Sequence, residues 1–194
     1  MAENKIKYGI KSCYYAVASI ASDGSATYTT PVAIPGAVSL SLDAQGERTP
    51  FYADNIEYWV SNWNNGYEGD LTVARLPDAF RKDVLGEYLD GDKLLVEKAN
   101  VEPIHFALLF QFEGDQQATK HVLYNCTASR PAIAGNTKED QISPETEAVT
   151  ITAKTIYVSA LSADVVKAKT TDATGSTSYA GWYSSVVMPT AATP

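Results

Sequence analysis

The sequence predicts a mainly β fold, a β-sandwich or open barrel with one flanking α-helix. Many short segments alternate apolar and polar residues with the period of a β-strand, whereas a single segment has helical spacing. Residues that favour strands are common, since the chain has 12 tyrosines and Thr, Val and Ile recur throughout. The 194 residues, 45% of them hydrophobic, are enough to bury a real core.

The first strands are expected at Tyr8–Ser19 and Ala37–Asp43. The second of these alternates cleanly, so it should have one buried and one polar face. Its apolar side holds Val38, Leu40 and Leu42, and its polar side holds Ser39, Ser41 and Asp43.

A long loop is expected at Ala44–Asn55, and long ordered loops in compact domains usually carry a function. Ile56–Ser61 reads as the next strand. The Asn64-Asn65-Gly66 turn then leads into a strand at Tyr67–Ala74, because Asn-Gly before an alternating stretch is a hairpin signal.

The expected helix starts at Pro77, which suits a first helical turn, and ends at Asp90-Gly91-Asp92. Its apolar stripe is formed by Phe80, Val84, Leu85 and Tyr88. A short strand at Lys93–Glu97 follows.

The strongest strand pair is His105–Phe112 with Ala118–Cys126. The first of these strands is largely apolar on both faces, so we expect it to be central and covered on both sides. Ala148–Tyr157 is the last strong strand. We therefore expect one domain over residues 1–160, and a C-terminal extension over 161–194 that docks by its aromatics and ends in a frayed terminus. Those aromatics are Tyr179, Trp182 and Tyr183.

Charge and composition exclude several classes of function. The net charge is −8, and residues 43–102 hold 13 acidic and six basic side chains, which disfavours ordinary nucleic-acid binding. No apolar run is long enough to cross a bilayer, and no signal peptide is evident, so we expect a cytoplasmic protein without a membrane partner. Cys13 and Cys126 are best read as buried free thiols.

No pattern of catalytic or metal-binding residues stands out, so we expect neither an enzyme nor a cofactor. His105 and His121 lack the further ligands that a zinc site needs and are interpreted as structural. Glu68 and Asp70 lie two apart and would be the acid pair of a glycoside hydrolase, although a solvated acidic edge is the preferred reading. Another alternative is a monomeric carbohydrate-binding β-sandwich, whose exposed platform would consist of Trp59, Trp63 and Tyr67.

Several segments, in order and spacing, resemble the major tail proteins of long-tailed bacteriophages, in particular the phi13-type family. The resemblance covers about residues 5–157, with a weaker echo at Tyr179–Tyr183. The segments are Ile34–Asp43 continuing through Thr49–Asn55, Asn64–Leu71, Leu76–Glu87, Phe106–Gly114 and His121–Thr127. A secretion-system tube protein is a close alternative.

The resemblance implies a tail-tube-like fold and a structural subunit of the virion tail tube, present in the host cytoplasm during assembly. It implies hexameric rings stacked into a channel through which DNA passes without specific binding. The implied partners are further copies of the chain, tail-tip and tail-terminator proteins, and a tape-measure protein in the lumen. An acidic lumen would let DNA slide.

Two sets of residues follow from this reading. We expect the loop residues Pro50, Phe51 and Tyr52 to contact a neighbouring subunit. Polar faces of strands are the candidates to line a wet channel. The lumen-facing candidates are Ser39, Ser41, Asp43, Glu68, Asp70, Thr150 and Thr152.

Overall fold

The computed structural model describes residues 6–114, 118–137, 144–170 and 177–191. The strands of its main sheet are β1 Ile10–Ile20, β2 Ala26–Tyr28, β3 Val32–Ala33, β4 Ala37–Ala53, β5 Ile56–Val73, β8 Phe106–Phe112, β9 Lys120–Ala128, β10 Glu147–Lys154 and β13 Lys167–Lys169. Two short hairpins pair β6 Tyr88–Leu89 with β7 Leu95–Val96, and β11 Ile156–Val158 with β12 Ala163–Val165. The helices are α1 Asp78–Asp83 and α2 Thr177–Ala180.

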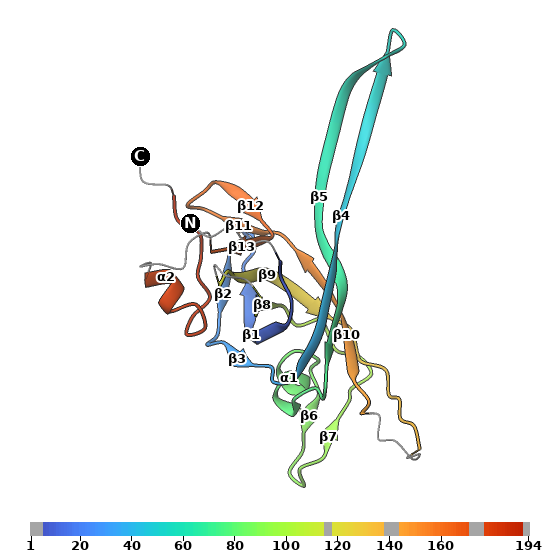
Figure 1. The fold of residues 1–194 in the computed structure, drawn as a ribbon, viewed down its shortest axis with the longest axis vertical. Helices are drawn as coiled ribbons and strands as arrows, with labels where there is room; N and C mark the ends of the chain where they lie inside the picture. The colour runs from blue at the N-terminus through green and yellow to red at the C-terminus, as the bar shows by residue number, and fades with distance from the viewer. Residues whose placement is uncertain (1–5, 115–117, 138–143, 171–176, 192–194) are drawn as a thin grey trace.

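The main sheet has nine antiparallel strands in the order β2-β1-β8-β9-β10-β5-β4, with β13 paired to β9 and β3 to β1. It remains an open sheet and does not close into a barrel (Figure 1). The mainly β fold is therefore confirmed. The described residues form two short helices, where one helix was expected.

Strands β4 and β5 form a hairpin that projects far from the rest of the molecule (Figure 1). At about 3.3 Å per residue, strands of 17 and 18 residues run on the order of 55 Å. The expected loop at 44–55 is therefore wrong, because this segment continues β4 up to a two-residue turn. Asp54 and Asn55 make that turn with φ of 52° and 63°, the left-handed geometry of a tight hairpin.

The Asn64-Asn65-Gly66 segment lies inside β5 and is not a hairpin turn. Gly46 pairs with Asn64 and Gln45 pairs with Gly66, so Asn65 has no partner on β4 and forms a β-bulge. Gly66 has a φ of +94°, which residues with a side chain rarely adopt. The bulge marks the place where β5 leaves β10, since the last pair of those two strands joins Ala153 with Tyr67.

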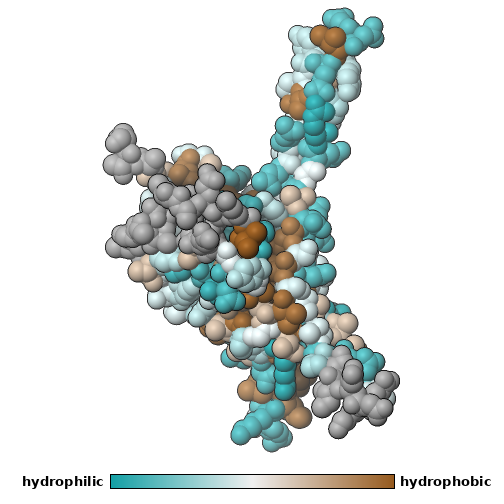
Figure 2. Space-filling view, in the orientation of Figure 1, coloured by the Kyte–Doolittle hydropathy of each residue, from teal (hydrophilic) through white to brown (hydrophobic). Residues whose placement is uncertain are grey.

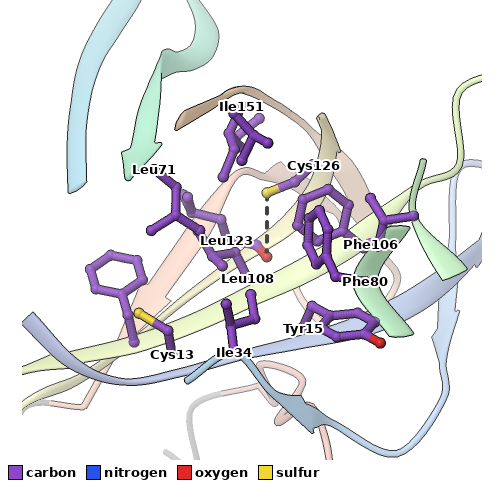
Figure 3. Close-up of a cluster of buried hydrophobic side chains, with 14 of the residues drawn as sticks. Cys13, Tyr15, Ile34, Leu71, Phe80, Phe106, Leu108, Leu123, Cys126 and Ile151 are labelled. Carbon is purple, nitrogen blue, oxygen red and sulfur yellow. Dashed lines mark hydrogen bonds between the residues drawn. The ribbon is translucent and has the colours of Figure 1, made fainter. Parts of the chain in front are cut away.

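Two apolar clusters pack on opposite faces of the sheet. The larger one lies between β1, β5, β8, β9 and β10 and includes Phe106, Leu108, Leu71, Ile151 and the buried thiols (Figure 3). The second lies on the other face of β1, β8 and β9 and includes Ala107, Leu109 and Tyr124. Strand β8 is thus covered on both faces, as its sequence predicted.

Helix α1 packs on the larger cluster mainly through one buried side chain, that of Phe80. Phe80 is fully buried and meets the rings of Tyr15 and Phe106 edge to face, with centroids 5.1 and 5.7 Å apart. The Tyr15 hydroxyl donates a 3.0 Å hydrogen bond to Asp83. The helix ends earlier than expected, at Asp83, because the chain turns at Gly86 with a φ of +71°.

Tyr88 does not share the helical stripe and instead lies exposed on β6. The Asp90-Gly91-Asp92 segment is the turn of the β6–β7 hairpin and not the end of a helix. The Asp90 carboxylate accepts hydrogen bonds from the backbone N–H groups of Asp92 and Leu94, at 2.9 and 2.7 Å.

The C-terminal segment covers the second cluster. Trp182 is 4% exposed, and the ring of Tyr183 stacks on Tyr14 at 4.6 Å. The Lys120 ammonium donates to the carbonyl of Tyr179 at 2.8 Å and lies 3.8 Å from the centre of its ring. Residues 161–170 add β12 and β13 to the body. The expected frayed end falls at 192–194, outside the described residues.

Candidate functional site

A polar face extends over three adjacent strands, β4, β5 and β10. Asp70 pairs with Ser41 on one side and Thr150 on the other, and Glu68 pairs in the same way with Asp43 and Thr152. Residues opposite one another on neighbouring strands project to the same side of a sheet. Ser39 joins this face through its pairing with Thr72. The fold thus brings all seven predicted polar residues onto one surface, exposed or half-buried throughout.

The other side of the same three strands is the core. Leu71, Val149 and Ile151 are at most 1% exposed, and Leu40 and Leu42 pack against them. Strict alternation therefore fixes the polar face, because a shift by one residue would bury carboxylates and expose leucines. The face carries the carboxylates of Asp43, Glu68 and Asp70 and many small hydroxyl groups. Across β5 and β10 the Thr150 hydroxyl donates a 2.8 Å hydrogen bond to Asp70.

Beyond the bulge, the hairpin carries exposed aromatic and aliphatic side chains. Phe51 pairs with Trp59 and Glu47 pairs with Trp63, so all four lie on one face of the two strands. Hydrophobic residues stand among hydrophilic ones along the projecting hairpin in Figure 2. The side chains that are 58–69% exposed there are Phe51, Tyr52, Ile56, Tyr58, Trp59 and Trp63.

The three residues predicted to contact a neighbouring subunit lie near the end of β4, just before the turn of the hairpin. Pro50 pairs with Val60 and is half-buried, in an edge strand where a missing backbone donor is tolerated. Phe51 and Tyr52 are exposed and project to opposite faces, as successive residues of a strand do. Tyr58, Trp59 and Ile56 were not predicted to belong with them. The sequence signal that could have grouped these residues is Asp54-Asn55, because this pair, flanked by strand-forming residues, is typical of a hairpin turn.

The proposed aromatic platform is not assembled as expected. Trp59 and Trp63 share a face, but the bulge at Asn65 places Tyr67 with Ala44 on the core side. The Lys167 ammonium lies 4.3 Å from the centre of the Tyr67 ring. Two of the three aromatics therefore remain as an exposed pair.

The histidines and cysteines make contacts within the fold, through hydrogen bonding, ring stacking or burial. His105 Nδ1 lies 2.7 Å from Oδ1 of Asn125, and His121 stacks on Phe110 at 5.1 Å. Cys13 and Cys126 are free and buried, as predicted. Burial raises the pKa of the Cys13 thiol to about 12 and also raises that of Cys126. Within the described residues, no three His, Cys, Asp or Glu side chains gather closely enough to hold a metal ion.

None of the helices in the described parts of the chain has the length and apolarity needed to cross a membrane. No curated protein is matched by this sequence. A family model described as phage tail tube protein matches residues 2–160. That range contains the projecting hairpin, the polar face and helix α1, and it agrees with the family that the sequence resembles. The chain therefore belongs to the phage tail tube protein family and is a structural component of a phage tail.

Proposed function

We propose that the chain assembles into hexameric rings that stack into a tube, and that the polar face of β4, β5 and β10 lines a channel for DNA. Family membership supports assembly into a tube with other tail components. The observation that carries the channel assignment is the continuous polar face, because it is the large solvated side of strands whose other side is the core.

Charge supports the same assignment. Glu68, Asp70 and Asp43 give the face three carboxylates, against the ammonium of Lys154 at its end. A wall with excess negative charge does not bind phosphates, and small hydroxyls keep it hydrated. DNA would slide along such a wall without specific contacts.

Strands β1, β8 and β9 are covered by the C-terminal segment, which packs on the second apolar cluster. Figure 1 places α2 on the side of the body away from β4 and β5. In the proposed tube this segment lies on the outer surface, the tape-measure protein and then DNA occupy the lumen, and tail-tip and tail-terminator proteins cap the two ends.

The open edge of the sheet supports assembly between subunits. Strand β4 is the last strand in the order, so one backbone edge of its 17 residues pairs with no other strand among the described residues. Long free edges of this kind pair with other chains unless they are covered. A ring covers them by placing each edge against the next subunit.

Negative-stain electron microscopy of concentrated purified protein tests this function. Rings or tubes with sixfold symmetry are expected, with or without a nucleating tail-tip complex. A chain that stays monomeric under both conditions and is absent from purified virions would rule the function out. The exposed pair Trp59 and Trp63 favours carbohydrate binding as a second candidate, which calorimetric titration with glycans would detect in the monomer.

A further inference from the structure

A groove of about 220 Å³ opens at the root of the long hairpin, beside the place where β5 leaves β10. Apolar and aromatic side chains of β4, β5, β8 and β9 form most of its wall. An engineered apolar cavity of about 150 Å³ binds benzene, so this groove has room for an aromatic side chain. Its apolar lining includes Leu40, Leu42, Tyr67, Phe110, Phe112 and Leu123.

Two lysines give this groove a positive rim. The Lys7 ammonium lies 4.9 Å from the centre of the Phe112 ring, and that of Lys167 lies 4.3 Å from Tyr67. Neither lysine forms an ion pair with any of the described residues. Two such cations beside an apolar groove, on a chain of net charge −8, favour an occupant that combines aromatic rings with carboxylates.

The distal half of the hairpin has this combination. Trp63 stands opposite Glu47, Phe51 stands opposite Trp59, and Asp54 lies in the turn. Its five exposed aromatic side chains present on the order of 600 Å² to solvent. These side chains lie on both faces of the hairpin, so a neighbouring chain that receives the hairpin covers apolar surface on either side.

A hairpin that fills this groove must belong to another chain, because the distal half of the hairpin points away from the body that holds its own groove (Figure 1). We propose that the groove at the root of one hairpin receives the distal half of the hairpin of a second copy. This inference rests on the proposed function, since it identifies where one subunit binds the next. The two surfaces differ, so the contact is head-to-tail and repeats from copy to copy until a ring closes.

Photo-cross-linking in assembled tubes tests the contact. A benzophenone amino acid replaces Phe51 in one sample and Trp63 in another, and Tyr157, exposed on β11, is the control position. Mixed light and heavy isotope labelling distinguishes bonds between chains from those within one. Cross-links from the hairpin to residues 40–42, 110–112, 121–123 or 167–168 of another chain are expected. Cross-links that map to β6–β7 instead would overturn the proposal.

Charge reversal provides an independent readout that needs no probe. Lys7→Glu with Lys167→Glu should raise the concentration needed for assembly about tenfold, which corresponds to ~1.4 kcal/mol per contact. Glu47→Lys with Asp54→Lys should do the same, and the combined four-fold variant should recover most of the loss. Lys98→Glu with Lys93→Glu, on the β6–β7 side, is the matched control and should assemble normally.

The outcomes separate the two claims. If the wild-type chain forms neither rings nor tubes, the proposed function fails. If the wild type forms tubes but the groove and hairpin variants assemble as it does, only the groove assignment is overturned.

Discussion

Gly66 lies directly beneath the carbonyl group of Ala153, at the point where the long hairpin separates from the sheet. A β-carbon at Gly66 would stand 1.8 Å from that oxygen. Residue 66 also requires a φ of +94° to form the bulge. This glycine thus allows β5 to pair with β10 in the main sheet up to Tyr67 and to continue on the other side of the bulge as one strand of the projecting hairpin.

Gly66→Ala should therefore lower the free energy of unfolding by at least about 2 kcal/mol, because a backbone oxygen must move and a strained φ remains. Chemical denaturation of the purified subunit measures this. Gly91→Ala is the matched control, since a β-carbon there meets nothing within 4 Å. Equal stability of the two variants would show that the bulge is not needed.

Phe80→Ala should destabilise the subunit by about 3–5 kcal/mol, because it leaves a cavity between Tyr15 and Phe106. For a chain of this size the melting temperature should fall on the order of 10 °C. Phe51→Ala removes the same side chain from the exposed hairpin and should leave the melting temperature of the monomer unchanged. An unchanged melt for Phe80→Ala would contradict its place in the core.

The larger part of the fold was predictable from periodicity. The alternation in residues 39–43 and 67–74 identified the buried and polar faces, and the apolar run at 106–112 identified a central strand. Val38 was wrongly placed on the buried side: the register shifts between Ala37 and Ser39, and Val38 is 54% exposed. The hairpin was missed because two turn signals compete. Asn65-Gly66 has the stronger local preference, yet its left-handed glycine serves a bulge, and the true turn is Asp54-Asn55.

The helix was predicted too long for a related reason. Phe80, Val84 and Leu85 do share a side that faces the core, but an apolar stripe does not show at which residue the helix ends. Gly86 ends it by taking a left-handed conformation against Val101, a contact that only the folded chain creates. The seven polar residues of the candidate channel followed from alternation alone. That these residues lie side by side on three strands could not be predicted, because the registers between the strands are not encoded in any local sequence pattern.

Stability should decline at alkaline pH. The ordinary pKa of a cysteine thiol is near 9, and burial raises that of Cys13 to about 12. Above pH 9 the unfolded chain releases a proton that the folded chain retains, so rising pH favours unfolding. The contribution is complete below pH 9 and is lost as pH approaches 12.

Urea unfolding at pH 7, 9 and 11 measures this decline. We expect similar free energies at the first two values and a lower one at pH 11. The decline should be shallower in Cys13→Ala, which lacks one of the raised groups. A free energy that rises between pH 9 and 11 would contradict the burial of the thiols.

Replacement of Phe51 and Tyr52 by Ser should leave the monomer folded and block tube formation. Both side chains are exposed in the single chain, so their loss removes surface that only a neighbouring subunit would cover. Circular dichroism checks the fold and electron microscopy checks assembly. Tyr157→Ser, an exposed change on β11, should assemble like the wild type. Tubes of the double variant at the normal protein concentration would exclude this part of the hairpin from the interface.

Glu68→Lys with Asp70→Lys should slow DNA ejection while tubes still assemble. New ammonium groups in the channel would bind phosphates, and added salt would screen them, so the delay should be greatest at low ionic strength. Phage carrying this pair can be compared with phage carrying Asp164→Lys, an exposed change on β12. Normal ejection at every salt concentration would move both carboxylates to the outer surface.

The most direct test of the central claim is a three-dimensional reconstruction of the assembled tube at a resolution that separates strands. We expect Ser41, Asp70 and Thr150 to face the channel and the C-terminal segment around Trp182 to lie on the outer wall. A tube in which the β4–β5–β10 face is turned outward, or is buried between rings, would contradict the proposed channel.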